Sequence, residues 1–277
     1  MLKKNKAKSK VKKKVLKKTV SKVKKKISNK IIDREPIIKT KPEWVKNALV
    51  NKLKYQKKYS DSIKKNDDFW KSEGKRISWI KPYKKIKNVK YSKKDVKIKW
   101  YEDGTLNASY NCIDRHLKDK KDKTAIIWVG DDPKDTKKIS YKKLHQEVSK
   151  AANGLKKLGI KKGDRVTIYL TMIPELAITM LACARIGAVH SIIFGGFSAE
   201  SITTRINDCE SEYIITADEG VRAGKKIPLK QITDEALRKC PDVKKCIIVK
   251  RTGNKVAWVK GRDVWYDDLI KDVSNKC

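Results

Sequence analysis

The chain has 277 residues, 39% of them hydrophobic, which is enough to bury the core of one large or two ordinary domains. This composition excludes a protein that is disordered throughout. The formal net charge is +38. Such an excess attracts nucleic acid, anionic membranes or phosphate-bearing ligands through long-range electrostatics, but it specifies none of them. A genome biased towards lysine would give the same excess with no partner at all.

The six cysteines and three histidines follow no metal-binding or disulfide pattern. No Cys-x-x-Cys pair occurs and the histidines stand far apart, so neither a zinc site nor a disulfide framework is expected. Cys183 lies in an apolar helical run and Cys246 stands beside two isoleucines. Both are therefore predicted to be buried thiols in a reducing compartment, and we expect a cytoplasmic protein.

No secretion signal or membrane span is expected. The first residues contain no continuous apolar segment, and a transit peptide would usually be rich in arginine, which is absent before Arg34. The most apolar stretch, residues 176–197, contains Arg185 and His190. It is typical of a buried helix followed by a buried strand.

Residues 1–33 form a lysine-rich tail, in which 15 of the first 30 residues are lysine. Repulsion between lysines four residues apart opposes a helix, which predicts a solvated, disordered arm. Apolar residues nevertheless recur at helical spacing, so a basic amphipathic helix on an anionic surface is the alternative. Any contact with nucleic acid or an anionic membrane would be made through this tail.

Residues 34–118 are rich in aromatic side chains but have no long regular period. Helices are expected at residues 43–53 and 60–72, within an irregular region that packs on a larger body. Aromatic residues between lysines are also compatible with stacking on single-stranded nucleic acid. No Gly-Phe motif of an RNA-recognition domain is present, and packing anchors are the simpler interpretation.

Residues 119–277 alternate apolar strands with amphipathic helices. Strands are expected at residues 125–129, 165–170, 190–194, 213–217 and 246–249. Helices are expected at residues 141–158, 175–186 and 198–209, with a fourth starting at Pro228. Ser140 is a predicted helix cap, Pro174 a helix start and Gly187 a helix stop. The alternation predicts an α/β fold with a parallel sheet covered on both faces, and a final hairpin of residues 255–259 and 262–266.

Two glycine-bearing loops follow neighbouring predicted strands. Gly195 and Gly196 follow one strand, and residues 218–225, with Arg222 and Lys225, follow the next. Ligands of parallel sheets bind outside the carboxyl ends of the strands, so bare backbone and two cations are expected to meet an anionic ligand there. An ordinary solvated loop is the alternative for residues 218–225. Asp164, Asp218 and Glu219 are interpreted as turn residues rather than catalytic acids.

The second loop is not a P-loop. Three residues instead of four separate Gly220 from Gly224, and no serine or threonine follows Lys225 to hold magnesium. No Gly-x-Ser-x-Gly, His-Glu-x-x-His or Gly-x-Gly-x-x-Gly motif occurs either. The residues alone therefore predict a phosphate site on an α/β sheet, and they identify no catalytic residue and no metal ligand.

Five segments resemble the acetyl-CoA synthetases, which are acetate–CoA ligases of the adenylate-forming, or AMP-binding, enzyme family. They are WYEDGTLNASYNCIDRHL at residues 100–117, IPE at 173–175, MLACARIGAVHS at 180–191, FGGFS at 194–198 and ITADEGVRAGK at 215–225. The resemblance extends from about residue 35 to the end. It implies part of the doubly wound parallel sheet of an adenylate-forming enzyme's N-terminal domain, at residues 119–277, and it removes the nucleic-acid interpretation of the aromatic region.

The resemblance also implies a reaction and a site. Acetate and ATP give acetyl-adenylate and pyrophosphate, and the thiol of coenzyme A (CoA) then takes the acetyl group and releases AMP. The residues that would hold the nucleotide end of CoA are Phe194, Gly195, Gly196, Arg222, Ala223, Gly224 and Lys225. Lys225 replaces the usual arginine, which keeps the charge but loses the bidentate fork.

Several parts of the family pattern do not occur in these residues. They are the phosphate loop ending in Pro-Lys-Gly, the acid that holds magnesium and the C-terminal lid lysine, so the sites for ATP and Mg²⁺ are expected to be absent. We expect the N-terminal part of an acetate–CoA ligase that cannot adenylate acetate alone, with a separate chain as a possible source of the catalytic half. The alternatives are a non-catalytic module that binds CoA or a partner, with its basic arm on anionic surfaces, and a decayed gene product that does not fold stably.

Overall fold

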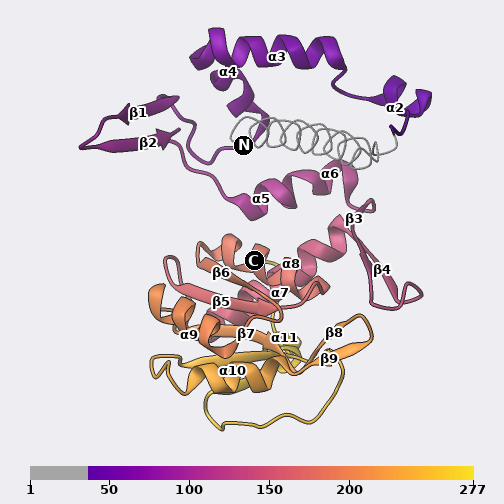
Figure 1. Cartoon of the computed structure of the whole chain (residues 1–277), viewed down its shortest axis with the longest axis vertical. Coiled ribbons are helices and arrows are strands. Elements are labelled where there is room, and N and C mark those ends of the chain that lie inside the picture. The colour runs from indigo at the N-terminus through magenta and orange to yellow at the C-terminus, as the bar shows by residue number, and fades with distance from the viewer. Residues whose placement is uncertain (1–36) are drawn as a thin grey trace, which may run out of the picture. The chain divides into compact units, whose positions relative to one another are not determined.

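The computed structural model describes residues 37–277 (Figure 1), which divide between two units, residues 37–66 and residues 67–277. The predicted disordered tail at residues 1–33 lies outside the described residues. Throughout residues 37–277, every helix is too short or too polar to cross a membrane. The apolar stretch at residues 176–197 instead belongs to a helix and the strand that follows it.

The described part of the first unit contains two helices, α2 (Pro42–Asn47) and α3 (Lys52–Lys64). The single helix predicted at residues 43–53 is therefore wrong. Ala48 is extended, and the Asn51 side chain accepts the amide N–H of Lys54 and so starts a new helix. The helix predicted at residues 60–72 is also divided, because the backbone leaves the helical region at Lys65 and α4 (Asn66–Glu73) follows.

The second unit begins with short elements around packed aromatic rings. The elements are η1 (Gly74–Arg76), the antiparallel strands β1 (Lys87–Tyr91) and β2 (Val96–Trp100), α5 (Ala108–Cys112), η2 (Asp114–His116) and α6 (Leu117–Lys120). The ring centroids of Tyr83 and Tyr101 are 4.5 Å apart, and those of Trp79 and Tyr83 are 4.9 Å apart. These rings serve as packing anchors for one another, as the sequence predicts.

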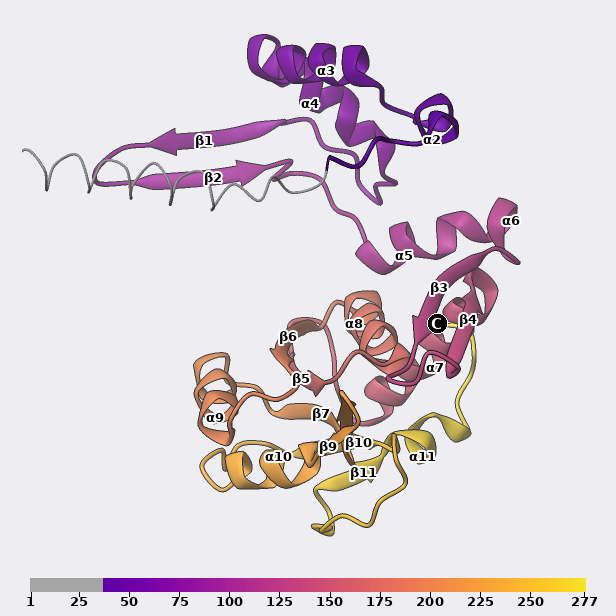
Figure 2. The same cartoon turned by 45° about the vertical axis from the view of Figure 1, so that its right-hand side comes forward.

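A five-stranded parallel sheet forms the centre of the second unit (Figure 2). Its strands are β5 (Arg165–Leu170), β6 (Val189–Phe194), β7 (Tyr213–Ala217), β10 (Lys245–Val249) and β11 (Asp263–Trp265), in the spatial order β11-β10-β7-β5-β6. Every neighbouring pair is parallel. All five residues of β7 are buried, as expected for a strand covered on both faces. The predicted α/β fold is confirmed.

Helices cover the two faces of this sheet. The helices are α7 (Tyr141–Lys157), α8 (Pro174–Ile186), α9 (Ala199–Asp208), α10 (Leu229–Leu237) and α11 (Tyr266–Lys271). Helix α7 packs against α8 and α11, whereas α9 packs against α10 (Figures 1 and 2). The signals read from the sequence act as predicted: the Ser140 hydroxyl caps α7, Pro174 starts α8, and Gly187 ends α8 in the left-handed conformation.

Strand β6 stands at one edge of the sheet and pairs with β5 only, among the strands of residues 37–277. Ile193 is the one buried residue of this strand, and Val189, Ile192 and Phe194 are exposed at the surface, so the buried strand expected here is instead an edge strand. An apolar edge of this kind offers unpaired backbone groups to another strand.

Three of the predicted elements are corrected by the structure. Strand β3 (Thr124–Val129) lies outside the parallel sheet and pairs antiparallel with β4 (Thr136–Ser140). Strand β4 was not predicted, because it contains two consecutive lysines. The loop predicted at residues 218–225 contains most of a hairpin, β8 (Gly220–Arg222) and β9 (Lys225–Ile227).

The hairpin predicted at residues 255–259 and 262–266 is the third correction. Residues 255–259 are not a strand, while β11 joins the parallel sheet beside β10 and is followed by α11. The buried carboxylate of Asp263 accepts the amide N–H of Val259, and Gly261 turns the chain in the left-handed region. This local turn replaces the expected strand pairing.

The predicted burial of the cysteines is confirmed at two positions. Cys183 and Cys246 are buried, and all six thiols are free. Burial raises the pKa of each of these two thiols to about 12. Both side chains therefore act as small core residues rather than as nucleophiles or metal ligands.

Candidate functional site

The strand order reverses its direction between β5 and β7. The chain passes from β5 to β6 on one side, then returns past β5 to β7 on the other. In open parallel sheets this reversal of direction marks the ligand site. The segments that leave β5, β6 and β7 here are the ones that carry Thr171, Gly195 and Gly220.

Thr171 packs between the two loops predicted to form one site. A Cβ atom added at Gly195 would lie 2.9 Å from Cγ2 of Thr171, and one added at Gly220 would lie 2.5 Å from the same atom. Both positions therefore require glycine for close backbone approach. The structure thus brings the two predicted loops together, and it does so at Thr171, which was not among the predicted site residues.

The turn after β6 is fixed by a buried tyrosine. The amide of Phe197 donates to the carbonyl of Phe194 across Gly195 and Gly196, and Gly196 has a φ of 112°. The hydroxyl of Tyr169 donates to the Phe197 carbonyl at 3.0 Å and accepts the Gly196 amide at 3.2 Å. Burial raises the pKa of this phenol, and the Gly196 hydrogen bond lowers it less. The expectation of free amides at this turn is wrong for Gly196.

The second loop ends in a tight β-hairpin. Arg222 and Lys225 are cross-strand partners, and the two residues between them, Ala223 and Gly224, have φ values of 50° and 72°. Positive φ at both central positions is the signature of the type I′ turn that suits a two-residue hairpin loop. The two cations therefore stand side by side at the base of the turn.

The turn amides are occupied by a carboxylate from a distant part of the chain. Asp131, in the loop between β3 and β4, accepts the amide of Ala223 through Oδ1 at 2.8 Å and the amide of Gly224 through Oδ2 at 2.7 Å. The expectation that bare backbone here meets an anionic ligand is therefore corrected. The side chains of Arg222 and Lys225 remain as the cationic groups of this loop.

Aromatic rings and guanidinium groups connect the two loops. The Arg222 guanidinium lies 5.8 Å from the centroid of the Phe194 ring, and Phe194 lies 5.9 Å from Phe197. On the other side, the Arg205 guanidinium lies 5.1 Å from the Phe197 ring. Phe194 is 57% exposed. This surface offers a flat ring to a heterocycle and cations to phosphate. Phe197 and Arg205 were missed, although Phe197 follows the two glycines directly.

The acidic pair after β7 holds backbone in place. The Asp218 carboxylate accepts the amides of Arg251 and Gly253 at 2.8 and 2.7 Å. Glu219 accepts the hydroxyl of Thr252, and this bond, ahead of those from Asn254 and Lys226, holds the pKa of Glu219 below its usual value. Both acids therefore stabilise the loop after β10, a segment more than 30 residues away, rather than their own turn alone.

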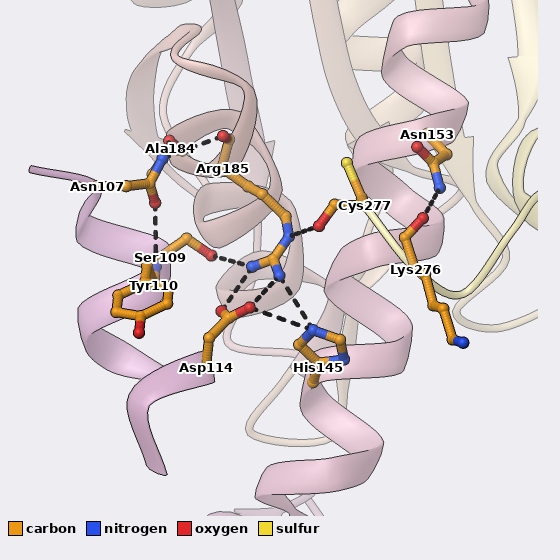
Figure 3. A network of polar contacts seen from close by, with 10 residues as sticks. All are labelled: Asn107, Ser109, Tyr110, Asp114, His145, Asn153, Ala184, Arg185, Lys276 and Cys277. Carbon is orange, nitrogen blue, oxygen red and sulfur yellow. Dashed lines mark hydrogen bonds and ion pairs between the residues drawn. The ribbon is translucent and has the colours of Figure 1, made fainter. Parts of the chain in front are cut away.

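A separate polar cluster surrounds Arg185 of α8 (Figure 3). Its guanidinium forms two bonds to the Asp114 carboxylate and further bonds to the Ser109 hydroxyl and the Cys277 carbonyl, and it lies 3.1 Å from Nε2 of His145. The Arg185 side chain is buried and fully engaged, so the cluster joins α8 to the segment of α5 and η2. It borders a cavity of about 460 Å³.

Two family models match the chain. One is described as "AMP-binding enzyme" and matches residues 113–274, and the other is described as "Acetyl-coenzyme A synthetase N-terminus" and matches residues 55–112. The chain is 60% identical over 235 residues to the acetyl-coenzyme A synthetase of Parvibaculum lavamentivorans, covering 85% of this chain and 36% of that protein. It is 56% identical over 243 residues to that of Mesorhizobium japonicum, covering 86% and 37%.

A solved structure shares the fold. The acetoacetyl-CoA synthetase from Streptomyces lividans superimposes with a TM-score of 0.69 over 78% of this chain and 32% of that chain. The sequence identity is 23%, so this likeness concerns the fold alone.

The parallel sheet and the match over residues 113–274 together define the class of protein: the chain belongs to the AMP-binding enzyme family. Within that family it is similar to the acetyl-coenzyme A synthetases, which confirms the resemblance read from the sequence. The chain spans 36% and 37% of the length of the two curated relatives described above.

Proposed function

We propose that this chain supplies the N-terminal part of an acetate–CoA ligase and binds the nucleotide end of CoA on the loops that follow β6 and β7. The reaction of the whole enzyme would convert ATP, acetate and CoA into acetyl-CoA, AMP and pyrophosphate. The names of the relatives support the reaction, since they are acetyl-coenzyme A synthetases. The proposed site consists of Phe194, Gly195, Gly196, Arg222, Ala223, Gly224 and Lys225.

The observation that carries the site is the contact between Arg222 and the Phe194 ring. Their separation of 5.8 Å joins the two loops into one surface with an exposed aromatic face and adjacent cations. A nucleotide presents a flat base, which can stack on the Phe194 ring, and anionic phosphates, which can pair with the two cations. Because Asp131 takes the amides of Ala223 and Gly224, these two residues would contribute through the shape of the turn.

Calorimetric titration of the 277-residue chain with CoA tests the site. Arg222→Ala is expected to weaken CoA binding by roughly tenfold or more, because a charge-assisted contact to phosphate is lost. Lys157→Ala is the matched control, since this exposed lysine at the end of α7 carries the same charge at the opposite end of the sheet. Equal losses in the two variants, or absence of binding by the unaltered chain, would contradict the proposed site.

We further propose that this chain does not form acetyl-adenylate alone. The 277 residues contain no Pro-Lys-Gly sequence, and the residues proposed for CoA include no acidic side chain that could hold Mg²⁺. A separate chain with those groups would be the partner in catalysis, in the cytoplasm, where free thiols such as Cys183 persist. Acetate-dependent release of AMP by the purified chain at the rate of a complete synthetase would overturn this proposal.

A further inference from the structure

We propose that Asp131 is a positioning residue for CoA: its carboxylate anchors the turn between β8 and β9 and thereby orients Arg222 and Lys225 towards the ligand. This inference rests on the proposed function. It adds a residue from the loop between β3 and β4, far from the two glycine loops in the sequence.

The hairpin has little to hold it in place by itself. Each strand has three residues, and β8 and β9 pair only with each other among the strands of residues 37–277. A two-stranded hairpin of this size is at best marginally stable alone. Ala223, with a φ of 50°, also occupies a region that residues with a side chain disfavour. The tip of the hairpin therefore needs support from outside.

The base and the tip of the hairpin are supported separately. At the base, Gly220 packs on Thr171 and Lys226 pairs with Glu219 at 3.3 Å. At the tip, the two bonds from Asp131 bind consecutive amides of the turn. Removing Asp131 would leave the base in place and free the tip. The side chains most affected would be Arg222 and Lys225, which flank the turn.

The loop that carries Asp131 is closed by hydrogen bonds of its own. The Gly130 amide donates to the Asp135 carbonyl at 2.7 Å, and the Lys134 amide donates to Oδ1 of Asp132 at 2.9 Å. The loop follows Trp128, whose indole N–H donates to the Met172 carbonyl at 2.7 Å, next to Thr171 in the segment after β5. The loop of Asp131 is thus attached to the segment after β5, close to the two glycine loops, as expected for a preorganised site.

The same geometry allows an opposite role, and the two roles predict opposite results. Consecutive amides of a turn are a common site for anions, so the Asp131 carboxylate could act as a competitor that excludes a phosphate from the turn. A competitor would weaken CoA binding, and its removal would tighten it. A positioning residue would do the reverse, because preorganised cations bind without the entropic cost of ordering the turn.

The experiment titrates the 277-residue chain with CoA and, separately, with adenosine 3′,5′-bisphosphate. Asp131→Ala removes both acceptors, and Asp131→Asn keeps one of them. We expect the dissociation constant for both probes to rise roughly threefold for the Asn variant and roughly tenfold for the Ala variant. Hydrogen exchange of the Ala223 and Gly224 amides should accelerate in the same order, a change that a general loss of stability would not confine to the turn.

Asp132→Asn is the matched control for charge. It removes one negative charge at the adjacent position, and its remaining side-chain oxygen still accepts the Lys134 amide. Loss of a negative charge near the cations would by itself favour an anionic ligand, so this control should bind as tightly as the unaltered chain or slightly more tightly. The difference between the variants at positions 131 and 132 then separates the effect of the lost hydrogen bonds to the turn from the effect of the lost negative charge.

Two outcomes would overturn the inference, and they are distinguishable. If the unaltered chain binds CoA and Asp131→Ala binds equally or more tightly, the positioning role is wrong while the CoA site stands. If the unaltered chain binds neither probe, the proposed function fails, and the positioning role for CoA fails with it.

Discussion

Lys230 and Asp263 form an ion pair between two buried side chains, with 2.9 Å between Nζ and Oδ2 and exposed side-chain fractions of 1% and 0%. Lys230 also bonds to Asp234 of its own helix and to the Ala257 carbonyl, while Arg262 bonds to both aspartates. The network ties α10 to the segment that leads into β11. Charges buried in this way are tolerated because every one of them has a partner.

Replacing Asp263 by alanine should therefore destabilise the fold. The buried Lys230 ammonium would keep Asp234 and lose its second carboxylate partner. The Val259 amide would also lose its acceptor. We expect a loss of about 3 kcal/mol in the free energy of unfolding, measured by urea denaturation. Asp267→Ala, at an exposed acid in the first turn of α11, should cost less than about 1 kcal/mol. Similar losses for the two variants would contradict the role of the network.

The same carboxylate should make stability depend on pH. Burial alone would raise the pKa of Asp263, but hydrogen bonds from Arg262, Val259 and Lys230 outweigh it and hold the pKa below its ordinary value of 3.8. Because the folded pKa is the lower one, the stabilisation is complete well above pH 3.8 and is lost as the pH falls through the folded value. Urea denaturation between pH 6 and 3 should show a shallower decline for Asp263→Asn than for the unaltered chain. Parallel declines would exclude this contribution.

Arg185 should not tolerate lysine. The lysine ammonium cannot reproduce the two parallel bonds to Asp114 together with those to Ser109 and the Cys277 carbonyl (Figure 3). We expect Arg185→Lys to lower the free energy of unfolding by about 2 kcal/mol. Arg238→Lys, at an exposed arginine after α10, provides the control and should change it by less than about 0.5 kcal/mol. A comparable effect at Arg238 would show that the network around Arg185 adds nothing specific.

The packing of both loops on Thr171 can be tested by a rescue. A methyl group at Gly220 would lie 2.5 Å from Cγ2 of Thr171, so Gly220→Ala should cost about 1–3 kcal/mol. Thr171→Ser removes that Cγ2 atom, and the double variant should recover most of the loss. Gly195→Ala is the contrasting case. Its added methyl would also lie 3.0 Å from the Leu170 carbonyl oxygen, which Thr171→Ser leaves in place. Recovery at both glycines or at neither would contradict this packing.

The thiols should fall into reactive and unreactive groups. Burial raises the pKa of Cys183 and Cys246 to about 12, whereas Cys112 and Cys277 are exposed. Since the thiolate is the reactive species, a chromogenic disulfide at pH 8 should modify the two exposed thiols rapidly and the two buried ones only as the chain unfolds. In strong denaturant all six should react. Fast modification of Cys183 in the folded chain would contradict the buried core.

The three central strands of the parallel sheet, β5, β7 and β10, could be predicted because they are apolar on both faces. The expected bounds of β7, residues 213–217, agree with the structure, and the rule for ligands at carboxyl ends predicted that the loops of Phe194 and Arg222 lie together, as the contact between these two side chains shows. Strand β4 could not be predicted in the same way. Its lysines face solvent, and only its pairing with β3 makes it a strand.

The parts that were missed depend on contacts distant in the sequence. Asp131 precedes the amides that it binds by 92 and 93 residues, and locally it is indistinguishable from an ordinary turn residue. Lys230 is in a helix where a lysine would normally reach solvent, and only the fold brings Asp263 to it. Residues of this kind are determined by the tertiary structure, which no local pattern encodes.

The open edge at β6 affects how copies of this chain behave in solution. Val189, Ile192 and Phe194 line a strand with one unpaired side in the described part of the chain, a surface on which a second β6 could add. The net charge of +38 opposes such an encounter, because like-charged molecules repel over a distance set by the ionic strength. We therefore expect molecules that stay apart in dilute buffer and that associate through this edge in concentrated salt, which screens the lysines.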